Sequence, residues 1–366
     1  MSTPLAALSE AGVSIWLDDL SRERLQSGSL AKLIADSHVV GVTTNPSIFS
    51  AAISGSNLYK DDILALKAEG ATTNEIVAEL TTSDVRNACD LFLPTFIGSN
   101  QVDGRVSIEV DPDLAYDTNA TIERALFLHH VVNRPNVLIK VPATLEGLPA
   151  IEELTARGIS VNVTLIFAVD RYKAVMDSYL RGLERRAASG LELKSVHSVA
   201  SFFISRIDAD IDKKLDAISA NHPLRGCAAI ANADLAFEAY LEVINSGRWS
   251  SLKALGANMQ RPLWASTGVK DKAYSPTRYV TELVAPGTVN TMPEGTLDAV
   301  RVTTESIPVD AITAKIADAR ALISDLAVAG IDMRKVVAEL EEDGLKKFED
   351  AWVHLLQSVA SVSEGE

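Results

Sequence analysis

The chain has 366 residues, of which 47% are hydrophobic and 23% are charged, a composition typical of globular proteins and unlike that of disordered chains. Its formal net charge of −15 argues against a nucleic-acid partner, because such partners favour a basic surface. Only two cysteines occur, Cys89 and Cys227, which are too few for a disulfide framework or a cysteine-based zinc site.

The hydrophobic pattern of the sequence contains neither a secretory signal nor a membrane-spanning segment. The start of the chain lacks the basic region and apolar core of a secretory signal, and no apolar run approaches the roughly 20 residues that span a bilayer. We therefore expect a cytoplasmic protein with reduced thiols and no membrane partner.

Short apolar runs alternate with helical stretches along most of the chain. The runs are rich in valine and isoleucine and nearly continuous, as expected for parallel strands covered on both faces. They are Val13–Leu17, Val39–Val42, Val106–Ile108, Val137–Val141, Ser160–Val163, Ser198–Phe202, Leu263–Ala265 and Val289–Met292. This alternation predicts an α/β fold, a (β/α)8 TIM barrel, with a doubly wound sheet as the alternative.

The C-terminal part, residues 308–366, has a helical pattern throughout. Gly330 is expected to end one helix, and Asp332 can cap the next. Apolar residues of the last helix fall on one face: Leu345, Phe348, Trp352, Leu355 and Leu356. We expect residues 1–366 to form a single barrel domain on which the helical extension 308–366 packs. The alternative use of this face is a contact between copies, as in a homodimer.

Polar side chains stand near the carboxyl ends of the apolar runs. In a (β/α)8 barrel these ends converge on one mouth, where the chemistry of such barrels is located. The residues are Asp18, Asn45, Glu109, Lys140, Asn162, Thr164, Ser201 and Ser266. Their recurrence from strand to strand predicts a shared pocket.

Lys140 lies inside the apolar run Val137–Val141. An ionised lysine inside a barrel is unfavourable unless it is paired or neutralised, so one interpretation is an outward side chain that snorkels between helices. The functional interpretation is an inward amine that desolvation keeps partly uncharged and that therefore attacks carbonyl carbons.

Asp18 and Glu109 end different runs and could both face Lys140. One carboxylate could take a proton from a substrate hydroxyl while the other orients a water molecule. The alternative is a buried lysine–carboxylate ion pair without any chemistry.

Motifs for metals and cofactors do not occur. The six histidines form no HExxH or similar metal spacing, and no GxGxxG, GxxxxGK or GxSxG motif is present. We therefore expect neither a metal ion nor an organic cofactor.

Two long segments, Gly41–Phe49 and Val137–Leu148, resemble signatures of the transaldolase family, which belongs to the Schiff-base aldolases of class I. Gly41–Phe49 is similar to the first family signature, and Val137–Leu148 to the second, which contains the Schiff-base lysine. Gly104–Asp111 and Asn162–Phe167 also resemble family segments, in the family's order. The resemblance extends over Ser14–Pro293 and looks like the long bacterial form.

The resemblance implies a (β/α)8 barrel, action in the pentose phosphate pathway and a role for each site residue. Lys140 would form the imine, and Asp18 would exchange the proton of the substrate hydroxyl next to the breaking bond. Glu109 and Thr164 would hold the catalytic water. Substrate contacts would come from Asn45, Asn162, Ser201, Phe203 and Arg206, with Arg206 binding the phosphate.

One stretch departs from the family. Better-known transaldolases place Ser-x-Arg after the seventh strand to bind the phosphate, whereas this chain has Ser266 followed by Thr267-Gly268-Val269-Lys270. Ser266 matches, and we hypothesise that Lys270 replaces the missing arginine as a point charge.

The expected activity is transfer of a dihydroxyacetone unit from sedoheptulose 7-phosphate or fructose 6-phosphate to an aldose phosphate. A class I aldolase, which is a lyase with the same lysine, is one alternative. A catalytically silent sugar-phosphate-binding barrel is another, although Lys140, Asp18 and Glu109 are all present. Small sugar phosphates are the expected partners in each case.

Overall fold

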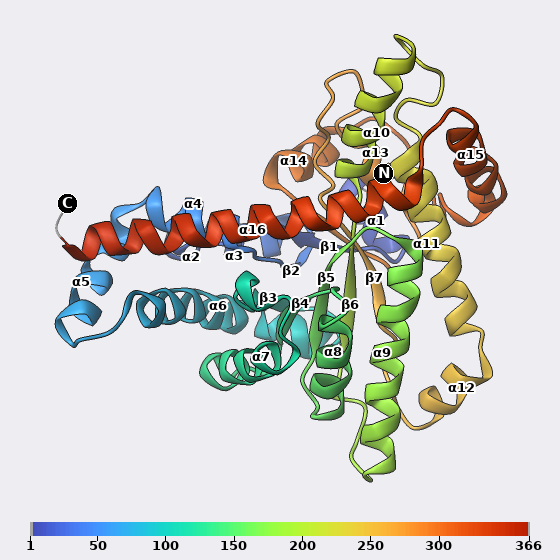
Figure 1. Ribbon diagram of the computed structural model, residues 1–366. Coiled ribbons are helices and arrows are strands. Elements are labelled where there is room, and N and C mark those ends of the chain that lie inside the picture. Colours follow the sequence, from blue (N-terminus) through green and yellow to red (C-terminus); the bar gives the residue numbers. More distant parts are fainter. Residues whose placement is uncertain (1–2, 365–366) are drawn as a thin grey trace.

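Eight parallel strands close into a barrel in the computed structural model, which describes residues 3–364 (Figure 1). The strands are β1 (Ser14–Leu17), β2 (Val39–Val42), β3 (Arg105–Glu109), β4 (Val137–Pro142), β5 (Val161–Ile166), β6 (Ser198–Phe203), β7 (Arg261–Ala265) and β8 (Val289–Met292). Each strand pairs with the next, and β8 pairs with β1, which closes the sheet. The predicted fold class is confirmed, and a doubly wound open sheet is excluded.

Helices connect successive strands and surround the barrel (Figure 1). They are α1 (Pro4–Glu10), α2 (Arg22–Gln26), α3 (Ser29–Asp36), α4 (Pro46–Ser54), η1 (Asn57–Tyr59), α5 (Lys60–Ala68), α6 (Thr73–Gly98), η2 (Pro112–Leu114), α7 (Thr118–Val132), α8 (Gly147–Ala156), α9 (Val169–Ala188), α10 (Ser205–Ile218), α11 (Ala228–Ile244), α12 (Gly247–Ala254), α13 (Arg278–Thr281), α14 (Glu294–Val302), η3 (Thr313–Lys315), α15 (Ile316–Val328) and α16 (Met333–Glu364). None of the helices described within residues 3–364 combines the length and apolarity that crossing a membrane requires.

The helical extension follows the local signals of the sequence. Gly330 adopts a φ of 92° just after α15, and the Asp332 carboxylate accepts a hydrogen bond of 3.0 Å from the backbone N–H of Arg334 at the start of α16. Residues 308–312 are an exception to the expected helix, because they form no helix before η3.

The last helix, α16, crosses the barrel and contacts α4, α6, α10 and β5 (Figure 1). Its expected apolar face is the one that packs inward, with Leu345, Phe348 and Leu355 all less than 5% exposed. The C-terminal half of the helix continues over α4 and α5, so that this half of α16 lies beside the first quarter of the chain (Figure 1). This placement brings α16 to the carboxyl ends of the strands.

The barrel interior is filled by a tryptophan and a polar cluster. Trp16 is fully buried and lies against Gly41 of the neighbouring strand β2. At the amino ends of the strands, the Arg261 guanidinium donates to Asp103 Oδ1 at 2.9 Å and to Ser14 Oγ at 2.8 Å. Trp16 and this polar cluster therefore occupy the barrel beneath the residues of the mouth.

Close packing of Trp16 against Gly41 predicts that a methyl group at position 41 is not tolerated. A Cβ on Gly41 would come within 2.5 Å of the indole ring. We expect Gly41→Ala to lower the free energy of unfolding by about 1–3 kcal/mol, because overpacking displaces the ring. Urea unfolding measures this loss. Gly98→Ala is the matched control, since nothing lies within 4 Å of its Cβ position. Equal stability of both variants would contradict the packing.

Candidate active site

A cavity of about 130 Å³ opens at the carboxyl ends of the strands. The residues that line it come from all around the barrel, and nine of them were predicted from the sequence. These nine are Asp18, Asn45, Lys140, Thr164, Ser201, Phe203, Arg206, Ser266 and Lys270. The two other predicted residues, Glu109 and Asn162, lie directly behind this lining, where each bonds to one of its members.

The Lys140 amine lies inside the barrel with only 4% of the residue exposed. Its Nζ donates to Glu109 Oε2 at 3.0 Å and to the backbone carbonyl of Thr44 at 3.0 Å. Register explains the pairing, because Lys140 of β4 stands beside Glu109 of β3. The outward orientation that we considered from the sequence is therefore not adopted.

Burial changes the acidity of the Glu109 carboxyl. Loss of water raises its pKa, the nearby Lys140 ammonium opposes this rise, and the more distant Asp18 carboxylate adds to it. A carboxyl with a raised pKa holds a proton more readily than an ordinary glutamate. The lysine–glutamate pair is therefore suited to exchange a proton between its two members as well as to form an ion pair.

Asp18 follows β1, two strands along the barrel from Glu109 of β3. Its Oδ1 accepts a hydrogen bond of 2.6 Å from Thr43, and the Thr43 hydroxyl also lies 2.6 Å from that of Thr291. Burial raises the pKa of Asp18, against the opposing effects of the Lys140 charge and the Thr43 hydrogen bond. This carboxyl therefore faces the cavity in a form that can both take up and return a proton.

Two buried polar atoms beside the lysine have no hydrogen-bond partner within the described protein. They are Oε1 of Glu109 and Oγ1 of Thr164. Buried polar groups normally have a partner, so these two atoms are free to bind a small polar molecule such as water. They mark a polar position next to the amine.

A chain of side-chain hydrogen bonds crosses the barrel under the cavity. Ser201 donates to Asn162 Oδ1 at 2.7 Å, and Asn162 Nδ2 donates to Ser107 Oγ at 3.0 Å. Asn162 is therefore fully buried and presents Ser201, rather than its own amide, to the cavity. Asn45 differs, because its Oδ1 caps α4 through the Ile48 N–H at 3.0 Å while the residue lines the cavity.

Positive charge gathers on one side of the mouth. Arg206 at the start of α10 lies over the Phe203 ring, 5.4 Å from guanidinium carbon to ring centroid, and its Nη1 has no partner among the described atoms. Burial lowers the pKa of Arg206. Lys270 lines the same cavity, and the Ser266 and Ser205 hydroxyls lie 3.0 Å apart beside it. A partly buried guanidinium with a free N–H is a suitable ligand for an anion.

Strained backbone occurs at two of the strand ends that line the cavity. Leu165 and Ser266, neither of them glycine, adopt φ values of 59° and 55°. In β5 this coincides with a shift of strand register between Val163 and Ile166. Such strain is common at functional sites, and here it lies at Ser266 and next to Thr164, both of which line the cavity.

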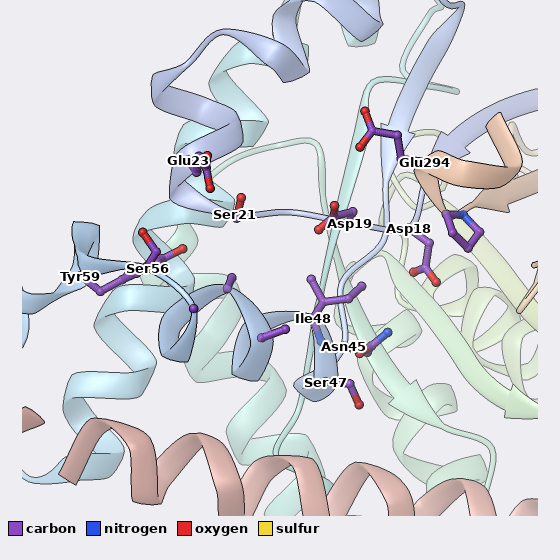
Figure 2. Close-up of a pocket in the computed structure, with 14 residues that line it drawn as sticks. Asp18, Asp19, Ser21, Glu23, Asn45, Ser47, Ile48, Ser56, Tyr59 and Glu294 are labelled. Atoms are coloured by element: carbon purple, nitrogen blue, oxygen red, sulfur yellow. Dashed lines mark hydrogen bonds between the residues drawn. The ribbon is translucent and has the colours of Figure 1, made fainter. Parts of the chain in front are cut away.

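Negative charge gathers on the opposite side of the mouth, in a second hollow of about 480 Å³ that shares Asp18, Asn45 and Pro293 with the first. In Figure 2, Asp18 and Asn45 line the right-hand part of this hollow, with Glu294 above Asp18 and Asp19 to its left. Arg24 bridges Asp19 and Glu294 at 2.6 Å and 2.5 Å. A phosphate would be repelled from this side and attracted towards Arg206 and Lys270.

Six of the residues that line the cavity were not predicted from the sequence, and the side chains of three of them, Thr43, Thr291 and Phe348, bear on the chemistry. Thr43 and Thr291 line the cavity, and their hydroxyls lie 2.6 Å apart beside Asp18. The alternation of inward and outward side chains along a strand could have found them, because it places Thr43 on the same side as Asn45 and Thr291 on the side opposite to Met292. Phe348 lines the cavity from α16. The sequence indicated only that Phe348 lies on an apolar helix face.

The fold and this site define a class of enzyme: a (β/α)8 barrel whose mouth holds a buried lysine between carboxylates, with cations for an anionic substrate. Among the described residues 3–364, no group of three or more histidine, cysteine, aspartate or glutamate side chains could hold a metal ion.

Comparison with known proteins gives the family. Residues 15–359 match the family described as Transaldolase/Fructose-6-phosphate aldolase. The chain is 55% identical over 363 residues to Transaldolase 1 of Streptomyces avermitilis, covering 99% of this chain and 96% of that protein. It is 56% identical to the transaldolase of Mycobacterium tuberculosis, with 96% and 95% covered, and 54% identical to that of Saccharopolyspora erythraea, with 97% and 96% covered. The chain belongs to the transaldolase/fructose-6-phosphate aldolase family.

The raised pKa of Asp18 predicts how its removal changes stability. The unfolded chain ionises Asp18 near the ordinary value of 3.8, below the folded pKa, so the stability of the folded protein falls as pH rises between the two values. Asp18→Asn removes this penalty. We expect it to raise the free energy of unfolding at pH 7 by about 0.5–2 kcal/mol while lowering activity, a gain that disappears below the unfolded pKa. Urea unfolding at pH 3.5 and 7 measures the difference.

Glu109→Gln is the contrasting variant. Although burial raises the pKa of Glu109 as well, this change leaves the buried Lys140 ammonium without the carboxylate that neutralises it. It should destabilise the protein at pH 7 by up to about 3–5 kcal/mol, the opposite sign to Asp18→Asn. A loss of stability in Asp18→Asn at pH 7 would contradict the assigned penalty.

Proposed function

We propose that this protein is a transaldolase in which Lys140 forms a Schiff base with a ketose phosphate and transfers a dihydroxyacetone unit to an aldose phosphate. The single observation that carries the proposal is the buried Lys140 amine, 3.0 Å from a carboxylate, in a cavity that also has free cationic groups. Family membership and the names of relatives more than half identical in sequence support the same reaction. The pentose phosphate pathway is where such a transfer takes place.

Imine formation begins with the lysine–glutamate pair. Glu109 accepts the proton of the Lys140 ammonium, and the free amine attacks the C2 carbonyl carbon of the ketose. The unpartnered Oε1 of Glu109 and Oγ1 of Thr164 hold a water that carries protons during loss of the C2 hydroxyl as water. The product is a protonated imine between C2 and Lys140 Nζ.

Bond cleavage depends on Asp18. Its carboxylate takes the proton of the C4 hydroxyl, the C3–C4 bond breaks, and the electron pair moves into the protonated imine. An aldose phosphate leaves, and an enamine remains on Lys140. C3 of the enamine then attacks the aldehyde carbon of the acceptor, while Asp18 returns its proton to the aldehyde oxygen. Hydrolysis of the new imine completes two half-reactions on one covalent intermediate.

Substrate orientation follows from the asymmetric charge of the mouth. Arg206, Lys270 and Ser266 bind the phosphate, since the acidic hollow on the other side repels it. Asn45, Ser201 and Phe203 line the space that remains for the dihydroxyacetone part, and Asn162 holds Ser201 in place. The global charge of −15 makes these local cations necessary for binding a phosphate ester.

The proposal also covers the domain organisation, the localisation and the assembly of the protein. We infer that residues 1–366 form one folding unit whose extension 308–366 belongs to the barrel, which the contacts of α16 with α4, α6 and β5 support. The acidic composition supports a cytoplasmic enzyme without a nucleic-acid partner. A homodimer is an expectation that light scattering tests.

Covalent trapping tests the central step. Borohydride in the presence of fructose 6-phosphate should reduce the imine and leave a stable adduct on Lys140, which peptide mass mapping locates. Lys140→Met should form no adduct and have no detectable transfer activity, because its side chain cannot attack a carbonyl. Normal turnover of Lys140→Met, or an adduct on another lysine, would refute the proposal.

The role of Lys270 predicts a selective change in affinity. Lys270→Ala should raise KM for fructose 6-phosphate about tenfold, because one charge-assisted contact with the phosphate is lost. KM for unphosphorylated fructose should not change. Lys272→Ala is the control, since Lys272 is exposed and does not line the cavity. An equal loss on both substrates would remove Lys270 from the phosphate site.

A further inference from the structure

The aromatic ring of Phe348 covers the reactive amine. The ring centroid lies 5.5 Å from Lys140 Nζ, the residue is only 4% exposed, and it lines the same cavity as Thr164 and Arg206. Phe348 comes from α16, more than 200 positions after the lysine in the chain. The last helix therefore completes a pocket that the barrel strands leave open.

Gly344 allows α16 to approach the mouth closely. A Cβ on Gly344, one turn before Phe348, would lie 3.0 Å from Leu165 and 3.3 Å from Arg206 Nη1. Glycine inside a helix is unfavourable compared with alanine. Its presence on the face that meets two mouth residues is explained by this contact.

Polar contacts hold α16 in place on both sides of the crossing. Glu341 pairs with Arg171 of α9 at 3.1 Å, and the same guanidinium donates to the carbonyl of Ala143 after β4. Further along, the His354 ring lies 2.8 Å from the hydroxyl of Ser50 on α4. The position of Phe348 is thus fixed by contacts before and after it.

A second aromatic residue extends the cover. Trp352, one turn after Phe348, lies in a small cavity of about 20 Å³ together with Glu109, Thr44 and Asn45. Phe348 faces the amine of the lysine–glutamate pair, and Trp352 lies on the glutamate side. We call Gly344, Phe348 and Trp352 the apolar roof. Phe348 and Trp352 cover the ion pair, and Gly344 allows the helix to approach it.

We propose that Phe348 is a specificity-determining residue that makes the protein a transferase rather than a lyase, by keeping bulk water away from the enamine on Lys140. This inference rests on the proposed function. Residue types at the mouth leave the fate of the enamine open, whereas the position of the ring decides it.

The two fates of the enamine differ by one molecule of water. In the lyase reaction a proton from water bonds to C3, the oxygen of that water becomes the C2 carbonyl oxygen, and its other proton goes to the nitrogen as the C2–N bond breaks. Free dihydroxyacetone and the Lys140 amine result. In transfer, C3 bonds to the acceptor aldehyde instead. An apolar ring beside Nζ lowers access of water to C3 while the enamine waits for an acceptor.

The ring has a second effect on the same nitrogen. Nζ carries positive charge while the imine is protonated, and an aromatic face within about 6 Å attracts a cation. Phe348 therefore stabilises positive charge on this nitrogen, both in the Lys140 ammonium and in the protonated imine. Leucine at this position would exclude water similarly but would lack the aromatic face.

The test measures the ratio of free dihydroxyacetone to transferred product, with fructose 6-phosphate as donor and erythrose 4-phosphate as acceptor. Phe348→Ala should raise this ratio about tenfold, because water reaches C3. Phe348→Leu should keep the ratio within about twofold of the wild type, because leucine excludes water similarly. An unchanged ratio in Phe348→Ala refutes the inference.

Leu355→Ala is the matched control for a loosened helix, because Leu355 is fully buried on α16 but does not line the cavity. It should lower stability and leave the ratio unchanged. A ratio raised as much as in Phe348→Ala would assign the effect to the helix as a whole and overturn the role of Phe348. If Phe348→Ala does not fold, Phe348→Val takes its place, because its smaller side chain should raise the ratio above that of Phe348→Leu. Equal ratios in these two variants would refute the role of Phe348.

The same experiment separates this inference from the proposed function. Absence of transfer and of a Lys140 adduct in the wild-type protein would refute the proposed function, and the role of Phe348 with it. Transfer and an adduct in the wild type, with an unchanged ratio in Phe348→Ala, would refute the role of Phe348 alone.

Discussion

The structure depends on one buried ion pair, between Lys140 of β4 and Glu109 of β3. Two charges taken out of water are unfavourable unless their geometry and remaining hydrogen bonds compensate, so this pair constrains everything around it. Parallel register places the two residues side by side, and the Thr44 carbonyl accepts a further hydrogen bond from the amine. Beneath the mouth, Trp16 and the Arg261–Asp103 pair occupy the interior, leaving the upper end of the barrel to the chemistry.

Charge is distributed across the mouth so that one enzyme can bind an anion despite its own negative charge. Arg206 and Lys270 lie on one side, and the acidic hollow with Asp19 and Glu294 lies on the other. Asp18 stands at the boundary and contributes to both hollows. We propose that this arrangement orients a sugar phosphate with its phosphate away from the carboxylates. It explains how an overall charge of −15 is compatible with such substrates.

The roof formed by Gly344, Phe348 and Trp352 connects the helical extension to the reaction. A barrel mouth alone is open to water, and an enamine exposed to water is lost as free ketone. Because α16 is held by Arg171 on one side and Ser50 on the other, its aromatic face stays over the amine. On our proposal the extension serves the chemistry as well as the packing of the fold.

The sequence by itself determined the strand–helix alternation, the caps of the extension and most of the lining of the mouth. These follow from local patterns: Lys140 and Asp18 stand at strand ends, which in a closed barrel must converge. Only the tertiary structure decided that Lys140 points inward to Glu109, that Asn162 acts through Ser201, and that Thr43 and Thr291 meet beside Asp18. It also decided that Phe348 of α16 lies against the Lys140 amine of β4. Side-chain direction and contacts between residues distant in the chain are set by strand register and helix crossing, and no local pattern of residues contains that information.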